Sequence, residues 1–172
     1  MKKKEFEIEI EILNEKAVLK AFNASQLLNR TLTLDLTKKL KGKASEGKFV
    51  IKEKQGKLKA EMYQFKLHQA YIKRLIGKGI SIVEDSFVCQ AKDSKLRIKP
   101  FLITRRKVHR SVRKALRSEA KSFIEKFVKE RTREKVFQAV LSGLLQRMIA
   151  VKLKKIYPLT VSELRVVKVE KK

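Results

Sequence analysis

The stretch ITRRKVHRSVRKALRSEAKSF, residues 103–123, marks the point where the chain changes from one kind of secondary structure to another. Before it, apolar and polar residues alternate in several short runs, which is the period of half-buried strands. After Lys107 the apolar residues recur at helical spacing, at Val108, Val112, Leu116, Phe123 and Phe127. The sequence therefore predicts strands followed mainly by helices, which is an α+β fold.

The same stretch is strongly basic. Between Arg105 and Arg117 it holds seven lysines and arginines and no carboxylate. Exposed helix faces usually mix signs, because Glu and Lys four residues apart stabilise each other. A solvated face is the ordinary interpretation of a charged stripe, but one without partners favours binding to a polyanion. The candidate binding residues are Arg105, Arg106, Lys107, Arg110, Arg113, Lys114, Arg117 and Lys121.

Two lysine-rich turns are further candidates for anion contact. The first, KKLKGK, contains Lys38, Lys39, Lys41 and Lys43. The second surrounds a predicted hairpin and contains Lys52, Lys54, Lys57 and Lys59. For both turns, simple solubility explains the composition as well as contact with a ligand does.

Composition limits the partner to a few classes. The chain has 172 residues, a net charge of +26 and 43% hydrophobic residues, enough to build a core. Nucleic acid and anionic membrane are the polyanions to consider. Membrane binding needs bulky apolar residues exposed beside the cations, and here they are needed to cover a sheet. No helix-turn-helix or zinc-finger spacing suggests sequence-specific DNA binding. We therefore expect RNA and no membrane.

We expect a single domain, 1–172, in which 1–104 are mostly strands, 105–157 form basic and amphipathic helices, and 160–170 form a closing strand. About seven strands are predicted, forming a barrel-like sheet with helices packed outside and a final C-terminal strand. Pro100 should lie at an edge or a bulge. In the first strand, Glu5, Glu7, Glu9 and Glu11 share one face, which should meet solvent or a basic neighbour.

Sequence signals of enzymes are missing. The chain has no phosphate-binding loop, no G-x-G-x-x-G, no H-E-x-x-H and no G-x-S-x-G motif. His68 and His109 are distant from each other and have no carboxylate cluster, and Cys89 is a lone cysteine expected to be buried. We therefore expect a protein of the cell interior that is not an enzyme and has no metal or cofactor.

Three stretches carry a resemblance to a known family. They are DSKLRI at 93–98 leading into Phe101, Thr104, Arg105 and Arg106; Val112-Arg113 in the basic helix; and IYPL at 156–159 followed by Arg165, Val166, Lys168 and Val169. In order and spacing these resemble the small-subunit ribosomal protein family of archaea and eukaryotes called S3Ae, or eS1. The likeness covers roughly residues 30 to 172. The sequence differs from the family in a short N-terminal lead-in, a short C-terminal tail and a Glu-rich first strand.

The resemblance implies a structural protein of the small ribosomal subunit, cytoplasmic and placed on the platform near the mRNA exit. It implies as partners the 3′ region of the small-subunit rRNA, neighbouring small-subunit proteins, and mRNA near the exit. Two alternatives stay open from the residues alone. One is an RNA-binding assembly or translation factor outside the ribosome, and the other is an RNA-processing enzyme.

Overall fold

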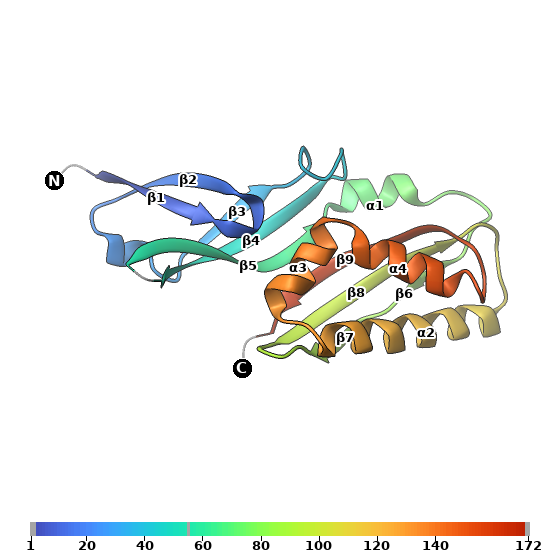
Figure 1. The fold of residues 1–172 in the computed structure, drawn as a ribbon. Helices are drawn as coiled ribbons and strands as arrows, with labels where there is room; N and C mark the ends of the chain where they lie inside the picture. The colour runs from blue at the N-terminus through green and yellow to red at the C-terminus, as the bar shows by residue number, and fades with distance from the viewer. Residues whose placement is uncertain (1–2, 55, 171–172) are drawn as a thin grey trace.

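The computed structural model describes residues 3–54 and 56–170, and its α+β architecture is shown in Figure 1. The strands of this described part are β1 (Lys4–Ile10), β2 (Glu15–Ala21), β3 (Thr31–Asp35), β4 (Ser45–Lys54), β5 (Lys57–Leu67), β6 (Ile82–Glu84), β7 (Phe87–Gln90), β8 (Lys95–Thr104) and β9 (Leu159–Val169). Its α-helices are α1 (Gln69–Leu75), α2 (Arg110–Lys129), α3 (Arg133–Leu141) and α4 (Leu144–Leu153). The predicted order of strands, helices and a final strand is confirmed.

The nine strands form one mixed sheet, but the sheet is not closed, so the predicted barrel is wrong. Its main path runs β2-β1-β5-β9-β8-β6, while β3 and β4 branch from β5, and β7 pairs with β8. The branch arises because β5 pairs with β4 along one edge and divides its other edge between two partners. Near Lys59 it meets β1 in parallel, and from Gln64 to Lys66 it meets β9. The sheet therefore splits at β5, and no ladder among the described residues joins β2 to β3.

The sequence predicted about seven strands rather than nine for two reasons. The segment that forms β2 alternates weakly, and its Val18 is exposed. The segment 81–91 divides into β6 and β7 opposite Pro100, where β8 has a register shift against β9. Proline has no N–H to donate to a ladder, so pairing is interrupted there. The bulge predicted at Pro100 is confirmed, within a central strand.

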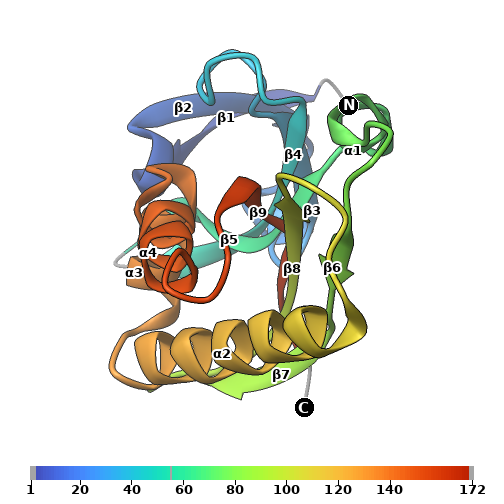
Figure 2. The ribbon, with the colours of Figure 1, turned by 90° about the vertical axis from the view of Figure 1, so that its right-hand side faces the viewer.

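Helices α2, α3 and α4 cover one face of the sheet rather than surrounding it (Figures 1 and 2). Helix α2 buries a stripe made of Leu116, Ala120, Ile124, Phe127 and Val128. Of the residues predicted for this stripe, Leu116 and Phe127 are buried. The other three, Val108, Val112 and Phe123, are only partly buried. A single hydrophobic core includes residues of α2, α3 and α4 and residues of the strands β1, β4 and β5.

Helices α3 and α4 meet at Ser142 and Gly143. Their axes are bent by 77°, and Gly143 between them has a φ of 73°, in the left-handed region that glycine adopts without strain. None of the described helices is, by itself, long and apolar enough to cross a membrane. The bent pair satisfies that test together by length and composition, and its apolar residues Val136, Phe137, Leu145 and Ile149 are buried in the core.

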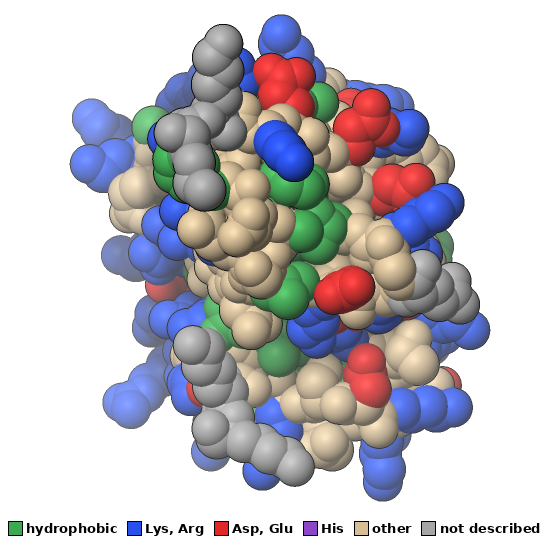
Figure 3. Space-filling view, turned by 90° about the vertical axis from the view of Figure 1, so that its left-hand side faces the viewer, with side chains coloured by type: hydrophobic (Ala, Val, Ile, Leu, Met, Phe, Trp, Pro, Cys, Tyr) green, Lys and Arg blue, Asp and Glu red, His purple; other side chains and the backbone are tan. Residues whose placement is uncertain are grey.

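The Glu-rich first strand meets a basic neighbour, as the sequence predicted. Strand β2 pairs with it so that Lys20 forms an ion pair with Glu5, and Lys16 forms one with Glu7. On the opposite face of β1, Ile8 and Ile10 are buried. Figure 3 looks at this end of the molecule and shows acidic and basic side chains interspersed around a strip of hydrophobic ones. The carboxylates are thus largely neutralised within the chain.

Candidate nucleic-acid interface

Seven cations lie together between the end of β8 and the first turns of α2. We call them the α2 basic cluster, and they are Arg105, Arg106, Lys107, Arg110, Arg113, Lys114 and Arg117. All seven are exposed. Within the part of the chain that the structure describes, no carboxylate forms an ion pair with any of them. The eighth predicted residue, Lys121, differs because its Nζ lies 4.0 Å from Glu125.

A buried polar contact holds the first three cations in place. The Thr104 hydroxyl accepts a hydrogen bond from the Ser81 N–H at 3.0 Å and donates one to the carbonyl of Arg106 at 2.7 Å. The Ser81 hydroxyl oxygen in turn accepts the Val108 N–H at 3.1 Å. Ser81 and Thr104 are both buried, so the bond between them is shielded from water, and the bonds to Arg106 and Val108 are part-buried. The loop 105–109 is therefore fixed, and its side chains project from a defined backbone.

The start of α2 is electrostatically unusual. Its first turn contains no acidic residue, and His109 at the N-cap makes no side-chain capping bond to any described residue. The N-terminus of a helix carries a partial positive charge and unpaired N–H groups, so acids usually lie there and cations are unfavourable. Here Arg110 and Arg113 stand at that end. An anion such as phosphate would relieve both the charge repulsion and the unpaired donors.

Four cluster residues share a face and surround one surface hollow. Arg110, Arg113, Lys114 and Arg117 are spaced by three, four and seven residues, which places them on one side of a helix. Together with Ile82 of β6 they line a hollow of about 310 Å³. Because the guanidinium group is a planar fork of donors, arginines around a hollow suit phosphate oxygens. The sequence predicted these arginines, but no sequence pattern indicated that Ile82 forms the other wall of the hollow.

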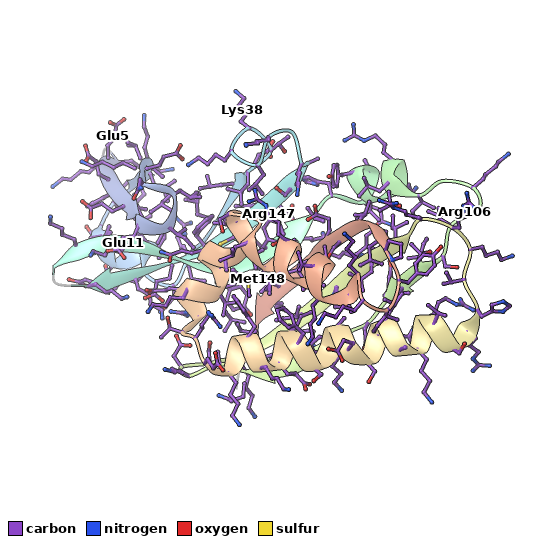
Figure 4. The ribbon with its side chains drawn as sticks, turned by 45° about the vertical axis from the view of Figure 1, so that its right-hand side comes forward. Glu5, Glu11, Lys38, Arg106, Arg147 and Met148 are labelled. Atoms are coloured by element: carbon purple, nitrogen blue, oxygen red, sulfur yellow. The ribbon has the colours of Figure 1, made fainter. Side chains whose placement is uncertain are left out.

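The KKLKGK turn is a weaker candidate in the structure than in the sequence. Lys39 pairs with Glu15 at 2.7 Å, and Lys43 pairs with Glu163. Lys38 and Lys41 form no ion pair with the described carboxylates. Figure 4 shows Lys38 on its loop and Arg106 near the start of α2, well apart from each other. The turn therefore does not extend the α2 basic cluster.

Three of the four hairpin lysines form ion pairs within the protein. Lys52 and Lys54 both contact Glu61, and Lys59 contacts Glu11. Burial alone would raise the pKa of Glu61, but hydrogen bonds from Lys54 and Lys52, together with Arg133, lower its pKa to about 2. Lys52 and Lys54 stabilise the junction of the sheet with α3, and Lys59 joins β5 to the segment that follows β1. Lys57 forms no ion pair with the described carboxylates.

The two histidines and the single cysteine lie in different parts of the fold. His109 is exposed before α2, and His68 precedes α1. Burial raises the pKa of the Cys89 thiol to about 12, so the thiolate is disfavoured. No group of three or more His, Cys, Asp or Glu side chains in residues 3–54 and 56–170 is placed to hold a metal ion.

Two comparisons relate the chain to known proteins. Residues 3–172 match the model of the ribosomal S3Ae family. A segment of 95 residues is 32% identical to the small ribosomal subunit protein eS1 of Nanoarchaeum equitans, covering 52% of this chain and 48% of that protein. The match thus spans about half the length of the curated relative.

Proposed function

The chain belongs to the ribosomal S3Ae family, and we propose that it is a structural constituent of the small ribosomal subunit that binds rRNA through the α2 basic cluster. The family is one of ribosomal proteins and not of enzymes. The observation that carries the proposal is a set of seven exposed cations around the N-terminus of a 20-residue helix, with no carboxylate partner among the described residues.

The chemistry of the cluster suits phosphate contact more than base reading. Arg110, Arg113 and Arg117 project from one side of α2 and line an open hollow together with Lys114. Double-stranded RNA has a major groove too deep and narrow for side chains, so proteins contact its phosphates, its 2′-hydroxyls and its shape. A folded rRNA already presents a unique arrangement of phosphates. A fixed constellation of guanidinium groups is therefore enough for specific placement.

The position within the subunit is the finer part of the proposal, and its support is the family resemblance. We place the chain on the platform near the mRNA exit, in contact with the 3′ region of the small-subunit rRNA and with neighbouring small-subunit proteins. The cluster would face the rRNA. The end carrying β1 and β2, where charges pair within the chain, would be left for solvent or protein.

Co-sedimentation and crosslinking test this function. The full chain is expected to stay with small subunits through a high-salt wash, as an integral constituent does, and residues 105–117 should crosslink to small-subunit rRNA. The proposal is overturned if the protein washes off, or if this segment crosslinks only to protein. A variant with Lys16, Lys20 and Lys66 changed to Gln is the matched control, because each of these lysines has a carboxylate partner. It should remain bound.

A further inference from the structure

Strand β3 has one free edge. Among the described strands it pairs only with β4, and it lies in the part of the molecule remote from the start of α2 (Figure 1). An edge strand presents a row of backbone N–H and C=O groups with which another extended chain can pair. The residues whose groups point to this edge follow from the ladder that β3 forms with β4.

The ladder between β3 and β4 is regular from end to end, so its bonded positions alternate. Just after β3, the Leu36 N–H donates to the Ser45 carbonyl at 2.9 Å, and just before it the Arg30 carbonyl accepts the Ile51 N–H at 3.0 Å. The even-numbered residues of β3 therefore bond to β4. The odd-numbered residues direct their N–H and C=O groups away from β4, where no described strand pairs with them. They are Thr31, Thr33 and Asp35.

This edge lacks the features by which sheets usually protect an edge. Native edge strands are short, bent by a bulge, or carry charged residues or proline. The free edge of β2 carries Glu15, Lys16 and Lys20, and β6 is only three residues long. Strand β3 reads TLTLD, is regular over its five residues and has no charge before Asp35. Its edge is therefore the one best suited to receive a further strand.

The apolar face of β3 is also incompletely covered. Leu32 lies opposite Phe49 of β4 in the ladder, so both side chains are on the same face of the sheet. Phe49 and Ile51 are 0% exposed, whereas Leu32 and Leu34 are only partly buried. A further strand beside β3 would place an apolar side chain next to each of these two leucines.

We infer that an extended segment of another protein pairs with the free edge of β3 in the assembled particle. Its backbone bonds to Thr31 and Thr33, and its apolar side chains, at every second position, cover Leu32 and Leu34. Strand addition of this kind obtains its affinity from main-chain hydrogen bonds and its specificity from alternate side chains. The inference rests on the proposed function, because the partner is placed in the small ribosomal subunit.

Charge separates this partner from two others. RNA is disfavoured because residues 31–34 contain no cation for a phosphate, and RNA has no row of backbone amides to pair with a strand. A second copy of the chain is disfavoured because each copy has a net charge of +26, and the two would repel each other. Arg30 precedes β3 and Lys48 lies opposite Thr33, and neither forms an ion pair with a described carboxylate. The partner segment should therefore be neutral or acidic between its apolar positions.

Hydrogen exchange in the free chain and in small subunits that contain it tests the pairing. In the free chain the amides of Thr31 and Thr33 should exchange fast, and those of Leu32 and Leu34 slowly. In the particle, exchange at Thr31 and Thr33 should slow about tenfold or more, the effect of one hydrogen bond, while Leu32 and Leu34 change little. A photo-crosslinking residue at position 33 should join to an extended segment of another protein.

A pair of variants tests the same contact. Thr33→Pro removes the outward N–H but no bond to β4, and proline is tolerated at such edge positions. In competition with wild type for assembly into small subunits, it should be incorporated about tenfold less. Thr33→Val retains the N–H and should compete equally. If Thr33→Pro does not fold, exchange and crosslinking still decide the question.

Three results would overturn the inference. These are unchanged exchange at Thr31 and Thr33 in the particle, crosslinks that join position 33 to rRNA or to a second copy instead of another protein, and full incorporation of folded Thr33→Pro. Failure of the proposed function looks different. In that case the wild-type chain would be washed from small subunits by high salt, whatever its pattern of exchange.

Discussion

The Nη2 atom of Arg133 donates a hydrogen bond to Oε2 of Glu61 at 2.7 Å, joining the start of α3 to the middle of β5. Glu61 also receives Lys52 and Lys54 from β4. The backbone N–H of Arg133 donates to Asp93 in the turn before β8 at 2.9 Å. The Glu61 carboxylate thus links β5, the strand at which the sheet branches, to helix α3.

This relationship predicts a loss of stability in acid. The pKa of Glu61 is lowered from its ordinary 4.5 to about 2, so the ionised form stabilises the fold above pH 4.5 and the effect disappears as the pH falls toward 2. Glu61→Gln should lower the free energy of unfolding at pH 7 by about 2 kcal/mol, allowing for solvent screening. It should also flatten the acid dependence between these pH values, measured by urea unfolding. Glu53→Gln, an exposed neighbour on β4, should match wild type. Equal curves for all three proteins would contradict the role of Glu61.

The salt dependence of RNA binding should report on the α2 basic cluster. Changing Arg110, Arg113 and Arg117 together to Gln should reduce the slope of log affinity against log salt by about 2, since each phosphate contact contributes ~0.7–0.9. Filter binding to a small-subunit rRNA fragment measures the slope. The variant with Lys16, Lys20 and Lys66 changed to Gln removes the same number of positive charges. It should keep most of the wild-type slope. If both triple variants change the slope equally, net charge rather than the cluster drives binding.

The buried contact between Ser81 and Thr104 should control the loop before α2. Thr104→Val removes the hydroxyl and leaves the Ser81 N–H and the Arg106 carbonyl unpaired, at a cost of about 1–3 kcal/mol. The Val108 amide should also exchange its hydrogen faster, because its acceptor on Ser81 is no longer held. Urea unfolding and hydrogen exchange measure the two effects. Thr160→Val, exposed on β9, is the control, and unchanged exchange at Val108 would show that the loop is fixed by other contacts.

Two neighbouring residues of α2 should differ in their contribution to the core. Ile124 is fully buried, so Ile124→Ala should cost about 2–5 kcal/mol. Phe123, which the sequence placed in the apolar stripe, is only partly buried, and Phe123→Ala should cost less. Thermal or urea unfolding gives the ranking. The reverse order would mean that α2 is rotated from its place in the structure.

The glycine between α3 and α4 should be required for its conformation alone. Gly143 has a φ of 73°, and a Cβ there would meet no atom of the described residues within 4 Å. Gly143→Ala should therefore destabilise by about 1–2 kcal/mol through backbone strain. Gly77→Ala, at a position that is equally open but has no positive φ, should be neutral or stabilising. Equal effects of the two changes, measured by chemical denaturation, would argue against strain at the bend.

The sequence by itself determined the local features. The period of apolar residues gave the strands before residue 104 and the helices after it, because that period follows from backbone geometry. Pro100 marked a bulge through its own backbone constraint. The excess of Arg and Lys in 105–117, without nearby acids, indicated the candidate interface. These features depend on residues close together in the chain.

Only the tertiary structure decided the features that depend on distant partners. Whether the sheet closes depends on how β5 divides its edge between β1 and β9, and no short stretch encodes that division. Which lysines are free depends on carboxylates such as Glu61 and Glu163, which lie far away in sequence. A cavity beside Gln146 combines a loop, a helical turn and a strand. Charge and hydrophobic period are properties of a single segment. Whether a charge is neutralised, a sheet closes or a cavity is enclosed depends on which segments meet.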